Sequence, residues 1–128
     1  MNDCYPYFCI ASSDDDQPIV EDLAVEIDFT GNLAASITHT DYEDRRYSCR
    51  VIARVNSDDA RTLARRYKME LKELPALIAR SMRDYYLPVN PNFREIQAAF
   101  KEVIERFIDE GCRLRIIRLR GRNGYTCC

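Results

Sequence analysis

The first half of the chain alternates apolar and polar residues, a pattern typical of strands that bury one face. Segments with this pattern follow one another at residues 23–29, 33–38 and 47–55. Short polar connections at 30–32 and 41–44 separate them. Because short turns join antiparallel neighbours, the pattern predicts a three-stranded antiparallel meander.

Helical spacing replaces the alternation after residue 56. Apolar residues then recur every three or four positions over 58–70, 74–86 and 92–110, which predicts three helices. Pro75 separates the first two, because proline is tolerated in the first turn of a helix and not in its interior.

Capping residues mark the ends of these helices. Ser57 is the expected N-cap of the first helix. Asn92 and Glu95 have the spacing of a capping box at the start of the third. Gly111 is the expected C-cap after it, because glycine readily adopts the left-handed conformation that ends many helices.

Residues 112–120 read as a last strand with imperfect alternation. Leu114 and Ile116 share one face, whereas Ile117 and Leu119 share the other. Either a bulge near 116–117 shifts the pattern, or both faces of the strand are partly covered. The strand joins the meander at an edge or between the early strands. Beside 23–29, its arginines would lie across from the acids of that strand.

The resulting order βββαααβ predicts an α+β fold. We expect a two-layer sandwich in which three helices pack on one face of an antiparallel sheet, formed by the meander and the C-terminal strand. A chain of 128 residues is most simply a single domain spanning 1–128. Residues 1–20 would form an N-terminal arm or an edge strand, and 121–128 a flexible tail.

Charge is divided unevenly along the chain. Residues 1–44 contain eleven acids and no lysine or arginine, whereas the remainder carries all nineteen basic residues. Such a division indicates either an acidic and a basic surface or two parts that neutralise each other. We favour intramolecular neutralisation, because strands that pair often place opposite charges across from each other.

Neither a signal-peptide pattern nor an apolar run long enough to span a bilayer is visible, so we expect a cytoplasmic protein without a membrane partner. The six cysteines are then expected to be reduced. A thiolate metal site would have to combine Cys4 and Cys9 with Cys127 and Cys128. Adjacent cysteines chelate poorly, and we expect no metal.

Evidence for catalysis is weak. His39 is the only histidine, and Asp41, Glu43 and Asp44 follow it closely, so it could act as a general base. No nucleophile signature and no phosphate or dinucleotide loop accompanies it. We therefore assign no catalytic residue and no cofactor, and rank an enzyme below the binding hypotheses.

The segment 47–86 runs strand, capped helix, turn, helix. This order resembles the ribbon-helix-helix DNA-binding domains, in which a dimeric two-stranded ribbon enters the major groove. The resemblance implies that Arg50 and Arg54 point at base edges. A helical hairpin packed on a sheet fits the same pattern, and we favour it.

The C-terminal residues RLRIIRLRGRNGYTCC concentrate arginine on and after the last strand. These side chains could follow a phosphate backbone, with a tyrosine stacked on a base, or bind an acidic protein surface. The candidate residues are Arg113, Arg115, Arg118, Arg120, Arg122 and Tyr125.

The function that fits best is a small, non-catalytic binding protein. Its partner would be another protein, or a second copy of itself paired through an exposed strand edge. The alternative is a nucleic-acid-binding regulatory protein that uses the basic C-terminal strand or the segment 47–86.

Overall fold

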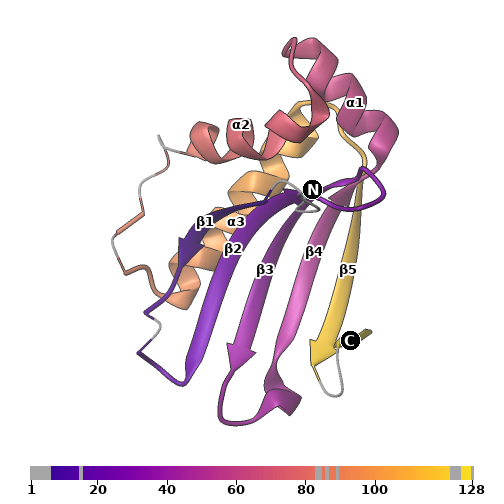
Figure 1. Ribbon diagram of the computed structural model, residues 1–128. Helices are drawn as coiled ribbons and strands as arrows, with labels where there is room; N and C mark the ends of the chain where they lie inside the picture. Colours follow the sequence, from indigo (N-terminus) through magenta and orange to yellow (C-terminus); the bar gives the residue numbers. More distant parts are fainter. Residues whose placement is uncertain are drawn as a thin grey trace, which may run out of the picture.

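Six antiparallel strands form one sheet in the computed structural model (Figure 1). The structure describes residues 7–14, 16–82, 85, 87–88, 90–121 and 125–127. For residues 45, 121 and 125–127 it describes the backbone alone. Each strand pairs with the next one along the chain. The strands are β1 (Tyr7–Ser12), β2 (Ile19–Ile27), β3 (Leu33–Asp41), β4 (Cys49–Val55), β5 (Leu114–Gly121) and β6 (Tyr125–Cys127).

Three helices separate β4 from β5: α1 (Ser57–Arg66), α2 (Leu74–Ser81) and α3 (Phe93–Asp109). The expected α+β class with an antiparallel sheet is therefore confirmed. The expected order βββαααβ is incomplete, because β1 precedes the meander and β6 follows the last long strand. In the described part of the chain, no helix combines the length and the apolar character needed to cross a membrane.

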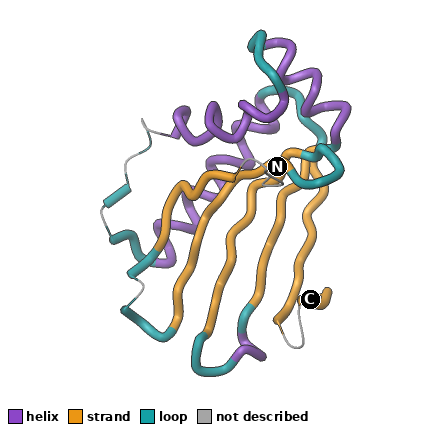
Figure 2. The backbone as a smooth tube through the Cα atoms, in the orientation of Figure 1, coloured by secondary structure: helices purple, strands orange, loops and turns teal. Residues whose placement is uncertain are grey.

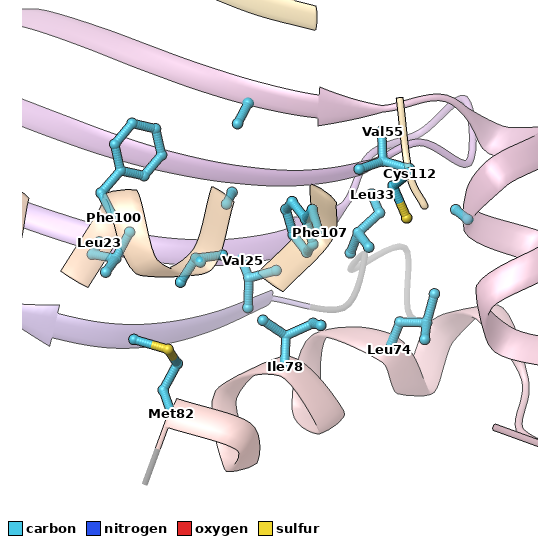
Figure 3. Packing of buried hydrophobic residues seen from close by; sticks show 14 of the residues in the cluster. Leu23, Val25, Leu33, Val55, Leu74, Ile78, Met82, Phe100, Phe107 and Cys112 are labelled. Carbon is cyan, nitrogen blue, oxygen red and sulfur yellow. The ribbon is translucent and has the colours of Figure 1, made fainter. Parts of the chain in front are cut away.

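The meander forms as its alternation predicts. Leu23, Val25 and Ile27 are buried on one face of β2. The residues in register with them on β3 and β4 are buried too, except Val51, which is partly buried. α2 packs against β1 and β2, and α3 packs against β2 and β3. Figure 3 shows the resulting core, in which Phe107 of α3 and Ile78 of α2 lie beside the β2 side chains.

Local polar contacts start the helices. The side chain of Asn56 accepts a hydrogen bond from the Asp59 amide at 2.8 Å, so Asn56 caps α1 and the expectation for Ser57 was wrong by one residue. The capping box of Asn92 and Glu95 at α3 is confirmed. Pro75 lies in the first turn of α2. Backbone N–H groups in this turn have no acceptor within the helix, so the absence of an N–H on proline removes no helical hydrogen bond.

The end of α3 determines where β5 begins. Gly111 has φ +84°, and its amide bonds the carbonyl of Ile108 at 2.9 Å. The amide of Cys112 bonds the carbonyl of Phe107 at 3.0 Å, which completes a Schellman motif. Both Phe107 and Cys112 are buried, so the motif turns the chain out of the helix while its flanks stay in the core.

The last long strand lies beside β4. Its register runs without a shift from Leu114 opposite Val55 to Arg120 opposite Cys49. The bulge near 116–117, one of the two alternatives for this strand, is therefore absent, and the strand does not lie beside 23–29. Instead both faces of β5 are partly covered: Ile117 is half-buried and Ile116 is 42% exposed.

Candidate partner-binding site

The sheet face opposite α2 and α3, here called the open face, joins acids of β2 to arginines of β4. The guanidinium of Arg50 donates to Glu26 Oε1 at 3.3 Å and to Ser36 Oγ at 3.2 Å. Arg54 Nε lies 3.8 Å from Asp28 Oδ2. These contacts pair the acidic first part of the chain with the basic remainder, as the charge division suggested.

Small side chains on β3 make these contacts possible. β3 lies between β2 and β4, so an arginine of β4 must extend across it to reach an acid of β2. Ala34 and Ser36 occupy the open face of β3 and are both buried. Larger side chains at these two positions would obstruct the path of the guanidinium groups.

Arg50 and Arg54 are thus held inside the molecule's own charge pairs. The Nε atom of each is buried and has no hydrogen-bond partner within the described residues. Both edges of β4 are occupied, by β3 and by β5, so β4 has no free edge for the dimeric ribbon that the ribbon-helix-helix resemblance implies. The segment 47–86 contributes β4, α1 and α2 to the larger α+β structure.

Arg113, just before β5, is also paired. Its amide donates to Asp59 Oδ2 at 2.9 Å, and its guanidinium donates to both carboxylate oxygens of Asp59 at 3.2 Å. The hydrogen bonds from the Arg113 side chain hold the pKa of Asp59 below its usual value. Asp59 lies in the first turn of α1, so this contact fixes the start of β5 against that helix.

The remaining arginines of β5 point to different sides of the sheet. Arg115 lies opposite Arg54 on the open face, and Arg118 lies opposite Val51 on the face against which α2 and α3 pack. Both are exposed, and neither has an ion-pair or hydrogen-bond partner among the residues that the structure describes. Arg120 takes part in an interaction and is not counted with them.

Arg115 has an unfavourable neighbour. Like charges directly opposite each other on paired strands are destabilising, and Arg54 and Arg115 form such a pair. Asp28 offsets the charge of Arg54 only in part, because the 3.8 Å separation is too long for a hydrogen bond. An external anion beside Arg115 would relieve the repulsion.

β5 also has an incompletely paired outer edge. β6 pairs with Leu119, Arg120 and Gly121 only. Residues 114–118 therefore have β4 on one side and, among the described residues, no strand on the other (Figure 2). We call this unpaired side of residues 114–118 the β5 edge. Arg115 and Arg118 both belong to this stretch.

His39 has an acidic partner, but not one of those expected. Its Nδ1 lies 3.0 Å from Oε2 of Glu21, which also accepts from Gln97 Nε2 at 3.3 Å. The His39 ring meets the edge of Phe93 at 5.7 Å between centroids. Glu21 is buried, and its Oε1 has no hydrogen-bond partner within the described part of the chain.

The acids that follow His39 in sequence have structural roles instead. Asp41 accepts from the amides of Glu43 and Asp44 at 3.0 Å and so closes the β3–β4 connection. Asp44 binds the guanidinium of Arg46. A surface pocket of about 510 Å³ is lined by Phe93 and its neighbours, and His39 does not line it.

A cysteine lies next to this pair. Cys49 is opposite His39 across β3 and β4, and Glu21 is opposite His39 across β2 and β3. The three residues thus form a row on one face of three neighbouring strands. Sequence reasoning missed this row, because strand register, which brings the three together, is not visible in any local pattern.

For two of the expected site residues the structure describes no side chain. Arg122 lies outside the described residues, and of Tyr125 only the backbone is described, in β6. Cys4 and Cys128 are outside as well, and of Cys127 only the backbone is described.

An edge position of the last strand was one of the two alternatives left open by the sequence, and the division of its arginines between two faces was missed although the sequence contained a sign of it. Arg115 and Arg118 are an odd number of positions apart, which in any regular strand places them on opposite faces.

Comparison with models of known protein families, with curated proteins and with solved structures finds no match for this chain.

Proposed function

We propose that this chain is a non-catalytic binding protein, and that β5 binds an acidic segment of another protein. The observation that carries the proposal is which of the arginines lie beside a carboxylate of the same chain and which do not. Arg50, Arg54 and Arg113 each lie beside a carboxylate of the same chain, whereas Arg115 and Arg118 have none among the described residues. The proposal retains the single two-layer domain with its helices on one face, and the cytoplasmic location, expected from the sequence.

A protein partner suits this strand better than nucleic acid does. A phosphate backbone is a continuous line of charge, and proteins follow it with basic groups on one surface. Arg115 and Arg118 lie on opposite faces, with Ile116 and Ile117 between them. Arginine beside aliphatic side chains is typical of protein interfaces, where the guanidinium pairs with carboxylates.

Peptide binding tests the proposal. The probe is a fluorescein-labelled peptide with a Glu-Val-Val-Glu centre and Gly-Ser flanks, and the control peptide has lysine in place of each glutamate. We expect fluorescence anisotropy to show binding of the glutamate peptide only. The double substitution Arg115→Ser with Arg118→Ser should weaken it at least about tenfold, because hydrogen bonds to charged groups contribute about 1.5–3 kcal/mol.

A matched variant controls for net charge. Arg61→Ser with Arg65→Ser removes the same charge from exposed positions of α1, and it should leave the affinity unchanged. Absence of binding by the glutamate peptide, or an equal loss in both double variants, would count against the proposal. Duplex DNA and single-stranded RNA serve as competing probes. Binding that falls steeply between about 50 and about 200 mM salt would favour nucleic acid instead.

A further inference from the structure

The β5 edge has the properties of a docking strand. Residues 114–118 pair with β4 in unbroken register, contain no proline and include two adjacent isoleucines, which favour extended structure. The opposite edge strand, β1, carries a register shift between Cys9 and Ala11. Such irregularities protect strand edges from unwanted pairing, and the β5 edge has none.

Unpaired backbone groups make such an edge a template for another strand. Along a strand, alternate residues direct their N–H and C=O groups to opposite sides. Part of the backbone of 114–118 therefore points away from β4, toward a side with no strand in the described part of the molecule. A segment laid alongside would gain main-chain hydrogen bonds there, which is how several peptide-recognition domains bind their ligands.

We propose that the partner's acidic segment binds as an added β-strand along the β5 edge, with the pattern acid–aliphatic–aliphatic–acid. This inference rests on the proposed function and specifies its geometry. Residues facing each other on paired strands share a face of the sheet. The order Arg115, Ile116, Ile117, Arg118 therefore sets one carboxylate on each face and two aliphatic side chains between them.

An acidic strand satisfies the β5 edge better than a second copy of the chain does. Two β5 strands that paired antiparallel through this same edge would place residues of equal parity opposite each other, because only alternate residues direct their backbone groups to the edge. With Ile116 opposite Ile116, each Arg115 would face Ile117 and each Arg118 would face Leu114, so neither arginine would gain a carboxylate. With Arg115 opposite Arg115, or Arg118 opposite Arg118, like charges would repel. An acidic strand obtains both the aliphatic and the ionic contacts.

Acid spacing is the first test. The Glu-Val-Val-Glu peptide presents one carboxylate to each face, whereas a peptide of the same composition with a Glu-Val-Glu-Val centre presents both to one face. We expect the second peptide to bind at least about tenfold more weakly, because one arginine then lacks a carboxylate. Equal affinity of the two peptides would overturn the strand geometry.

Backbone methylation is the second test. Two further peptides carry N-methyl groups on alternate residues of the Glu-Val-Val-Glu centre, one on each of the two possible sets. In an added strand only one set of amides faces β5, so one peptide should lose binding at least about tenfold and the other should retain it. Retention by both peptides, or equal loss by both, would exclude strand addition.

Charge reversal identifies the partner side chains. The variant Arg115→Glu with Arg118→Glu should lose the glutamate peptide and gain the corresponding Lys-Val-Val-Lys peptide. Both positions are exposed, so the variant is expected to fold, and far-ultraviolet circular dichroism checks that it does. Failure of the lysine peptide to bind the folded variant would contradict the assignment of these two arginines.

The outcomes separate the two proposals. If no glutamate peptide binds, the proposed function itself fails. If the peptides bind without regard to acid spacing or methylation, the function stands and strand addition is wrong. A molar mass that rises with protein concentration in light scattering, and that is abolished by Arg115→Glu with Arg118→Glu, would assign the β5 edge to a second copy and overturn the inference.

Discussion

At the scale of single residues, polar side chains determine where the strands turn. Asp28 is the clearest example. Its Oδ1 accepts from the amide and the hydroxyl of Thr30 and from the amide of Asn32, at 2.8–3.0 Å. Gly31 follows with φ +86°, a conformation that suits glycine. Together they reverse the chain between β2 and β3.

Replacing Asp28 with alanine should destabilise the protein by about 1–3 kcal/mol, because the donors of Thr30 and Asn32 lose their acceptor. Asp28→Asn retains one acceptor oxygen and should cost less. The difference appears as a lower midpoint in urea-induced unfolding. Equal stability of the alanine variant and the wild type would mean that the turn does not depend on this carboxylate.

The effect of Asp28→Ala on the free energy of unfolding should depend on pH. Burial acts to raise the pKa of Asp28, but the hydrogen bonds from Thr30 and Asn32 outweigh it and lower the pKa below its usual value. The ionised carboxylate therefore contributes stability above its unfolded pKa of about 3.9, and this contribution is lost as pH falls through the lowered folded pKa. The stability gap between wild type and Asp28→Ala should shrink below about pH 4. A gap that stays constant would contradict the shift.

At the scale of elements, periodicity and caps were sufficient to predict most of the fold. The meander and three helices follow from their apolar patterns, and the caps at Asn92 and Gly111 were visible as residue types. β1 and β6 were not predictable in the same way, because β1 is irregular and β6 has only three residues. The pairing of β5 with β4 could not be predicted from the sequence, because no local sequence pattern indicates which strands are neighbours in the sheet.

Gly111 tests how α3 ends. Its φ of +84° costs other residues about 1–2 kcal/mol, and no atom lies within 4 Å of the position a β-carbon would take. Gly111→Ala should therefore destabilise the protein by that amount through the backbone alone. Gly111→Asn should cost less, because asparagine tolerates this conformation. Denaturant midpoints of the two variants give the comparison, and the reverse order would contradict the explanation.

At the scale of the whole molecule, the sequence predicted that the acidic and basic parts neutralise each other, and the contacts across the open face agree. The candidate arginines were identifiable as residues. Their division into paired and unpaired groups was not, because it depends on the register of β4 and β5 and on the position of Asp59 in α1.

The interaction energy between Arg50 and Glu26 tests whether this neutralisation stabilises the protein. Both side chains are partly exposed, so a double-mutant cycle with Arg50→Gln and Glu26→Gln should give a coupling of about 0.2–1 kcal/mol. The coupling should fall at about 1 M salt, where charges are screened over about 3 Å. A coupling near zero at low salt would show that the contact does not stabilise the sheet.

Amide hydrogen exchange of β5, with and without the Glu-Val-Val-Glu peptide, tests the central claim most directly. In the free protein, amides of 115–118 that bond to β4 should exchange slowly, and the alternate amides that face outward should exchange fast. Saturating peptide should slow the fast amides and leave the rest of the sheet unchanged. Slow exchange at every one of these amides before peptide is added, or peptide protection confined to other strands, would contradict a free β5 edge that binds acidic segments.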